Sequence, residues 1–268
     1  MIAEIEGKLS KSRFDRAVRL EDQLTGNFFG SLRYLPFDIA MKPILKNSVI
    51  PPEALDCLDS VQLEEWDDRI HFWRKWDEDG TEPDVVIDLD EIVILIEVKF
   101  NSGFSADADT DDAPELVSNV EHELKESNHQ LKRESDLLIN QYPNATNRVL
   151  LLLARETFAT KVYENIDKLR DSGKPIITPG VDFGYITWQK TLTELRGISG
   201  TDGFQNLIIS DLVQLLEHKG FEQFENFVFD DMEVVNPDAH WEYDVPYSAA
   251  FRFDFIKRIR EDLYYGFK

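Results

Sequence analysis

The sequence predicts an α/β protein with a mixed central sheet flanked by helices. Three observations support this fold class: helical periodicity near the N-terminus, a group of apolar strand segments in the first half, and helical segments alternating with later strands. At 268 residues and 42% apolar composition, the chain can bury a sizeable core. We expect residues 1–190 to form this core. Residues 191–268 are expected to be a mainly helical extension packed on it within one continuous domain.

The first helix is expected from Ser12 to Leu35, because apolar residues recur there at helical spacing. At roughly 100° per residue, Glu21 lies in the middle of the apolar stripe, while Arg16 and Arg19 point away from it. A carboxylate on a buried face needs a partner. A core salt bridge to an arginine and a functional site both explain Glu21 from the sequence alone.

Three strands are expected next. An aromatic segment predicts the first at Ile70–Trp76, and a tight turn at Leu89–Asp90 joins the other two, Asp84–Leu89 and Ile92–Phe100. The third strand is a near-continuous apolar run, which is typical of a strand covered on both faces.

The second half alternates helices with strands. Ser105–Glu115 is expected to be a solvated loop, and its alternating aspartates lack the glycine and terminal glutamate of an EF-hand. The elements expected after it are a helix from Pro114 to Gln141, a strand at Arg148–Ala154, a helix at Ala159–Arg170, a strand at Gly184–Trp188 and a helix at Leu207–His218.

The predicted hairpin carries charges on otherwise apolar strands. Glu97 and Lys99 are two residues apart and therefore share one face. The turn brings Asp84 toward the same end, although a straight antiparallel register must be distorted to place it beside Glu97. A buried charge is costly unless it is compensated. An ordinary cross-strand ion pair is the simpler alternative, but the unbroken apolar run before Glu97 is unlike a solvated strand.

Asp84, Glu97 and the carbonyl of Val98 would form an oxygen site of the kind that Mg²⁺ prefers. Lys99 would then orient or deprotonate a water, or stabilise charge on a phosphoryl oxygen.

Composition limits the functional classes. With 29 basic and 52 acidic residues, the chain has a net charge of −23 and would repel DNA unless local patches or metal ions offset the field. The single cysteine, Cys57, excludes an intramolecular disulfide framework, and no membrane-spanning segment or signal peptide is expected. We therefore expect a cytoplasmic protein.

Pro83-Asp84, the following strand turn and Glu97-Val98-Lys99 resemble the motif of the PD-(D/E)XK nuclease superfamily. The resemblance covers roughly Ser12 to Trp188 and implies a restriction-endonuclease-like αβββαβ core. More narrowly, Glu21-Asp22-Gln23-Leu24-Thr25 and two other segments, Tyr34-Leu35-Pro36 and Asp211-Leu212-Val213-Gln214-Leu215-Leu216, are similar to uncharacterised bacterial members of this group.

The resemblance implies catalytic roles for Asp84, Glu97 and Lys99. It also implies Mg²⁺, for which Mn²⁺ can substitute, as a cofactor, and adds Glu21 on the first core helix to the metal site. The helix after the motif often carries a glutamine in this superfamily, which Gln130 matches. Gln130, Arg16 and Arg19 are the expected substrate-binding residues.

Three functions follow. The first is a Mg²⁺-dependent deoxyribonuclease in restriction or another defence against foreign DNA, working alone, as a homodimer or with a partner protein. The second is a catalytically silent protein of the same fold that acts as an acidic, nucleic-acid-mimicking binding module. The third is glycoside hydrolysis by paired carboxylates, which gives Lys99 no role.

Overall fold

The computed structural model describes residue 5 and residues 16–63, 65–76, 81–100, 113–199 and 202–222. Within two of these ranges, the side chains of residues 16–19 and 113–123 lie outside the description. The described residues belong to one compact unit, residues 1–223.

A five-stranded mixed sheet forms the centre of this unit, in the order β1 (Ile70–Phe72), β2 (Val85–Asp88), β3 (Ile92–Val98), β4 (Asn147–Ala154) and β5 (Asp182–Thr187). The first three strands pair antiparallel, whereas β3, β4 and β5 run parallel. The middle strand β3 therefore has one antiparallel and one parallel neighbour.

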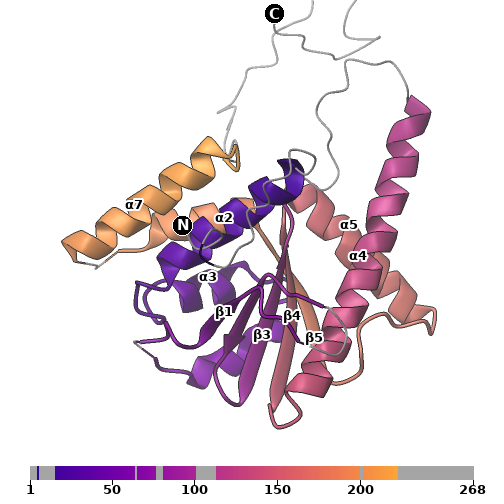
Figure 1. Cartoon of the computed structure of the whole chain (residues 1–268), viewed down its shortest axis with the longest axis horizontal. Helices are drawn as coiled ribbons and strands as arrows, with labels where there is room; N and C mark the ends of the chain where they lie inside the picture. The colour runs from indigo at the N-terminus through magenta and orange to yellow at the C-terminus, as the bar shows by residue number, and fades with distance from the viewer. Residues whose placement is uncertain are drawn as a thin grey trace, which may run out of the picture. The chain divides into compact units, whose positions relative to one another are not determined.

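Helices cover both faces of the sheet, as Figure 1 shows. The helices are α2 (Arg16–Leu32), α3 (Met41–Ser48), α4 (Ala113–Gln141), α5 (Glu156–Asp171), α6 (Trp188–Gly197) and α7 (Gly203–His218), with the 3₁₀ segment η1 (Pro52–Ser60). Side chains of α4 and α5 pack on one face, and those of the other helices pack on the opposite face.

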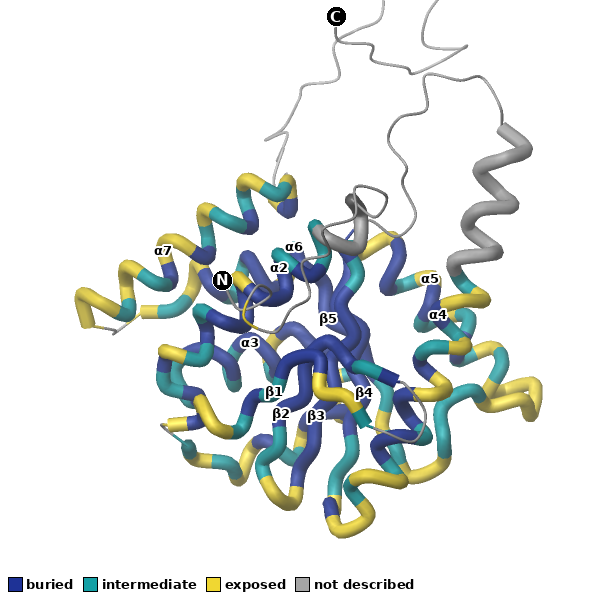
Figure 2. Tube along the Cα trace, in the orientation of Figure 1, coloured by how far each residue is buried: buried dark blue, intermediate teal, exposed yellow. Residues whose placement is uncertain are grey.

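The alternation of side chains along β3 supplies both cores. Ile92, Ile94 and Ile96 pack with the helices on the α2 side, while Val93 and Leu95 pack beneath α4 and α5. The whole strand is buried, as its dark blue colour in Figure 2 shows. This double coverage explains why its sequence is apolar at nearly every position.

The predicted α/β class and the order of its main elements are confirmed. Two elements were not expected: α3 and η1. Each has at most nine residues, so its apolar periodicity repeats too few times to stand out in the sequence.

Several boundaries differ from the prediction for local reasons. The first strand stops at Phe72 because Trp73 takes a positive φ of 44°. The last strand stops at Thr187, whose hydroxyl accepts a hydrogen bond from the Lys190 N–H and caps α6. The first helix ends at Leu32 instead of Leu35, and its predicted start lies outside the described residues.

Two further expectations concern segments only partly described. The loop expected at Ser105–Glu115 lies outside the described residues up to residue 112, and α4 already begins at Ala113. The extension expected at residues 191–268 is described to residue 222, where α6 and α7 make it helical.

Gly184 provides a test of packing in β5. A Cβ at this position would lie 3.0 Å from the Ile50 carbonyl oxygen and 3.1 Å from the Val49 Cγ2. Gly184→Ala should therefore lower the free energy of unfolding by about 1–3 kcal/mol in urea titrations. Gly197→Ala in α6 is the matched control, because a Cβ there meets nothing within 4 Å. Equal stability of the two variants would contradict the packing described for β5.

Candidate active site

The β2–β3 hairpin places Asp84 directly opposite Glu97. The register pairs Val85 with Ile96, so the next pair outward is Asp84 and Glu97, and the Asp84 Oδ2 accepts a hydrogen bond of 2.9 Å from the Val98 N–H. The expected distortion of the register was wrong. Leu89 closes the turn on Ile92, with an N–H···O bond of 2.9 Å. The turn is thus centred one residue later than expected, which moves every pairing by two positions and aligns the two carboxylates.

Trp73 holds the other side of Asp84. Its indole Nε1 donates to the Asp84 Oδ1 over 3.1 Å, and its backbone N–H donates to the Asp84 carbonyl over 3.2 Å. The positive φ of Trp73 costs on the order of 1–3 kcal/mol and is held by this surrounding structure. Sequence reasoning gave Trp73 no role beyond its strand. Its place in an aromatic segment ten residues before Pro83 was the available clue.

Glu97 and Lys99 form the centre of the cluster. Glu97 continues the row of Val93 and Leu95 beneath α4, and it is only 2% exposed. The Lys99 Nζ lies 2.6 Å from the Glu97 Oε1. Because the Glu97 side chain is buried, its end of this ion pair is shielded from water.

Glu21 joins the cluster from α2. Its Oε2 accepts a hydrogen bond of 2.8 Å from the Phe100 N–H, and its Oε1 lies 3.6 Å from the Lys99 Nζ. Among the described side chains, Lys99 supplies the positive charge beside Glu21, and the side chains of Arg16 and Arg19 lie outside the description. Glu21 therefore reaches the end of β3 and meets the other charged side chains there.

Glu134 on α4 is the carboxylate that sequence reasoning did not assign to the site. It is fully buried, and its Oε1 accepts a hydrogen bond of 3.2 Å from Gln130 Nε2, one helical turn earlier. Glu97 is the charged neighbour that acts most strongly on its carboxyl group. The clue was its place beside the apolar stripe of α4, next to Gln130.

Burial and mutual repulsion perturb this cluster. Burial, followed by the charges of Glu97 and Glu21, raises the pKa of Asp84 well above its usual range, against the opposing effects of Lys99 and the Val98 N–H. Burial and the neighbouring Glu97 likewise raise the pKa of Glu134 well above its usual range. Burial raises the pKa of Glu21 too, although Lys99 and the Phe100 N–H oppose it.

Lys99 is held as a cation. Burial alone would lower its pKa, but the charges of Glu97, Glu21 and Asp84 outweigh burial and raise the pKa above its ordinary value. A lysine in this state can donate hydrogen bonds and stabilise negative charge, but it is a poor base. The geometry thus favours two of the expected roles of Lys99, orientation of water and charge stabilisation, over deprotonation of water.

The carboxylate oxygens of this cluster are of the type that hard divalent cations prefer as ligands. Two buried oxygens, the Glu97 Oε2 and the Glu134 Oε2, have no hydrogen-bond partner. The other carboxylate oxygens face N–H or ammonium donors and still hold spare lone pairs. Within the described part of the chain, however, no three His, Cys, Asp or Glu side chains converge as a ready metal site. Binding would therefore require shifts of side chains, including the Lys99 ammonium.

The remaining expected site residues are tested less directly. Val98 contributes its N–H to Asp84, and its carbonyl as a cation ligand stays a prediction. Gln130 is brought to the cluster through Glu134. Arg16 and Arg19 lie in α2, but their side chains are outside the described residues.

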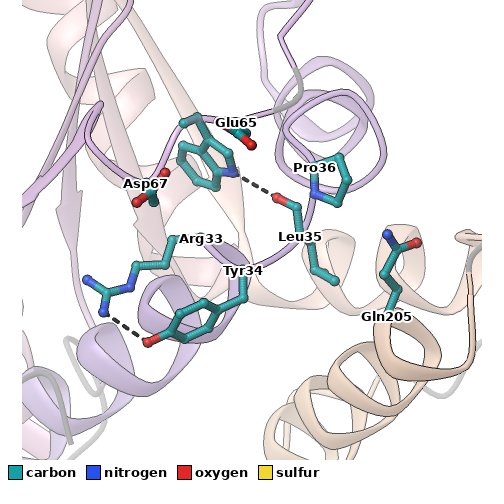
Figure 3. Close-up of a pocket in the computed structure, with 8 residues that line it drawn as sticks. Arg33, Tyr34, Leu35, Pro36, Glu65, Asp67 and Gln205 are labelled. Carbon is teal, nitrogen blue, oxygen red and sulfur yellow. Dashed lines mark hydrogen bonds between the residues drawn. The ribbon is translucent and has the colours of Figure 1, made fainter.

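Two surface pockets lie away from this cluster. The larger, of about 680 Å³, is lined by Arg33, Tyr34, Trp66 and Gln205 among others, and Figure 3 shows Arg33 hydrogen-bonded to the Tyr34 hydroxyl. Arg33 follows Glu21 by 12 residues, or about 18 Å along a helix axis. The second pocket includes Ile92 at the opposite end of β3. Neither pocket contains a residue of the carboxylate cluster.

No family model, curated protein or solved structure matches the chain. Among the helices that the structure describes, none has the length and apolar character needed to cross a membrane.

The pH dependence of stability tests the burial of Glu134. With its pKa raised from the ordinary 4.5, folded Glu134 binds its proton more tightly than the unfolded chain does, so wild-type stability falls as the pH rises above 4.5. Glu134→Gln does not titrate at this position. Its stability relative to wild type, measured by urea unfolding in EDTA, should therefore increase from about pH 5 to about pH 8.

Asp136→Asn is the control for this experiment, because it removes an acidic group from the same helix. Slight burial would raise the pKa of Asp136, but hydrogen bonds from Lys132 and Thr178 lower it from the ordinary 3.8. The free energy of unfolding of Asp136→Asn should therefore fall relative to that of the wild type as the pH rises toward the ordinary aspartate pKa of 3.8, and the difference should stay constant at higher pH. A flat or falling difference for Glu134→Gln would contradict the buried carboxyl pair.

Proposed function

We propose that the protein is a Mg²⁺-dependent nuclease that hydrolyses DNA phosphodiester bonds, with restriction or defence against foreign DNA as its setting. The observation that carries the proposal is the cluster of three buried carboxylates and the partly buried Glu21 around the Lys99 ammonium at the end of β3. Such a cluster needs either protons or a bound cation. The five-stranded α/β architecture is compatible with a restriction-endonuclease-like fold, which we propose on the same grounds.

Asp84 and Glu97 would hold the cation, with Glu21 and the Val98 carbonyl as further oxygen donors. When bound, Mg²⁺ would supply Lewis-acid stabilisation of a phosphoryl oxygen and lower the pKa of a bound water. Mn²⁺ has similar ligand preferences and would substitute for it.

The protein side chains would orient the reaction. Trp73 and the Val98 N–H fix the two oxygens of Asp84, so this carboxylate keeps one orientation. Lys99 stays protonated, and its ammonium group would donate a hydrogen bond to the attacking water or to the negatively charged phosphoryl group. Its mobility is limited by the ion pair with Glu97 and by the nearby Glu21.

The acidic net charge of −23 makes DNA binding depend on local cations. A cation bound at the cluster would remove part of the repulsion where the phosphodiester must approach. Arg16, Arg19 and Gln130 are proposed to contact the substrate. We propose DNA as substrate on the strength of the motif and the cytoplasm as the location.

A catalytically silent, acidic binding module is the second candidate. It is favoured by the strong negative charge and by the Lys99 ammonium, which already balances part of the cluster without a metal ion. In this case the cluster would remain partly protonated and would need no divalent cation.

A cleavage assay separates the two candidates. Purified protein is incubated with linear and supercoiled DNA, single-stranded DNA and RNA in Mg²⁺, Mn²⁺ or EDTA. We expect DNA cleavage that requires a divalent cation. Asp84→Asn and Lys99→Met should each lower the rate by about 10²-fold or more, because they remove a cation ligand and a donor to the reacting groups.

Lys190→Met is the matched control for Lys99→Met. Lys190 forms a half-exposed i,i+4 pair with Glu194 on α6, and its loss should leave the rate unchanged. Circular dichroism establishes that each variant is folded. Cleavage that survives both Asp84→Asn and Lys99→Met would refute the site, and absence of cleavage by the wild type on every substrate would favour the silent module.

A further inference from the structure

The unassigned carboxylate Glu134 faces Glu97 across the interface between α4 and β3. Glu134 is 0% exposed and Glu97 is 2% exposed, so water does not solvate either group. Each has an Oε2 without a hydrogen-bond partner, and Glu97 is the charged neighbour that acts most strongly on Glu134. Two ionised carboxylates cannot donate to one another, so this pair requires either a proton on one of them or a bound cation.

Among the residues that the structure describes, none donates a hydrogen bond to either Oε2. The charged groups that act on Glu134 are Glu97, Asp84 and Lys99, of which only Lys99 is positive. The Lys99 ammonium lies against the other Glu97 oxygen, Oε1, and near Glu21. The two unpartnered Oε2 atoms therefore belong to neighbouring buried carboxyl groups, and the described ion pairs supply no cation to either atom.

Gln130 fixes the orientation of Glu134. The Gln130 Nε2 donates to the Glu134 Oε1, which leaves the buried Oε2 without a hydrogen-bond partner. This arrangement uses the i,i+4 spacing of a helix to pre-set a carboxylate in an apolar interface. If this position served only to pack α4 on the sheet, an apolar side chain would be sufficient.

We propose that Glu134 is a fourth carboxylate of the cation site and that it and Glu97 together bind a divalent cation between α4 and β3. The inference rests on the proposed function for the identity of the cation, Mg²⁺ or Mn²⁺. It adds a ligand from α4 to the residues of the hairpin and α2. Cation binding then also joins α4 to the sheet, so the docking of this helix depends on the loaded site.

The test measures cation binding by the full chain without substrate. Mn²⁺ and Mg²⁺ are titrated calorimetrically into wild type, Glu134→Gln and the control Asp136→Asn, which removes one exposed acid of the same helix. We expect Glu134→Gln to weaken the Mn²⁺ affinity by about tenfold to a hundredfold. Asp136→Asn should match the wild type.

Thermal unfolding supplies a second readout. Mn²⁺ should raise the Tm of the wild type and of Asp136→Asn, and this shift should be largely lost in Glu134→Gln. Addition of Mn²⁺ should slow the hydrogen exchange of α4 in the wild type but not in Glu134→Gln. Because glutamine has the same shape and can donate to the Glu97 Oε2, the variant is expected to fold.

The outcomes separate this inference from the proposed function. Equal Mn²⁺ affinity and Tm shift in wild type and Glu134→Gln would overturn the role of Glu134, even if DNA is cleaved. Absence of any Mn²⁺ or Mg²⁺ binding by the wild type would also overturn it, and would leave Glu97 and Glu134 as a protonated pair. Binding that depends on Glu134 without cleavage of any nucleic acid would support the inference and refute the nuclease.

Discussion

One ammonium group cannot balance three buried carboxylates and the partly buried Glu21, and this imbalance governs the described structure around the end of β3. In a medium of low polarity the free energy of an ionised carboxylate depends on the donors directed at it. The protein supplies such donors from distant parts of the chain: the indole of Trp73, the N–H groups of Val98 and Phe100, and the Lys99 ammonium. They satisfy most of the oxygens and leave the Oε2 atoms of Glu97 and Glu134 without a hydrogen-bond partner.

Much of the fold and of the site could be predicted, because the deciding patterns are local. The apolar run before Glu97 indicated a strand covered on both faces, and the two-residue period placed Glu97 and Lys99 on one side of it. Glu21 was recognised by its position on an apolar helical stripe. The structure brings these residues together with Asp84, whereas their chemical role stays a prediction.

The rest depends on geometry that a sequence pattern does not contain. The alignment of Asp84 with Glu97 follows from a turn centred one residue later than expected, which the residue types near Asp90 did not determine. Trp73 and Glu134 reach the site from segments distant in sequence, and each resembles an ordinary member of its element. A buried glutamate on a long charged helix is recognised only when the helix is packed on the sheet.

The position of the hairpin turn has a consequence for how this protein can vary. The turn at Asp90–Glu91 and the carboxylate cluster lie at opposite ends of the seven-residue strand β3, roughly 20 Å apart. Because the turn sets the register, an insertion or deletion there that shifted the pairing would separate Asp84 from Glu97 at the far end of the hairpin. Segments that leave the carboxyl ends of β3 and β4 begin beside the cluster and do not set this register. Evolutionary change in substrate choice is thus expected to concentrate in those segments, while the length of the turn is expected to stay constant.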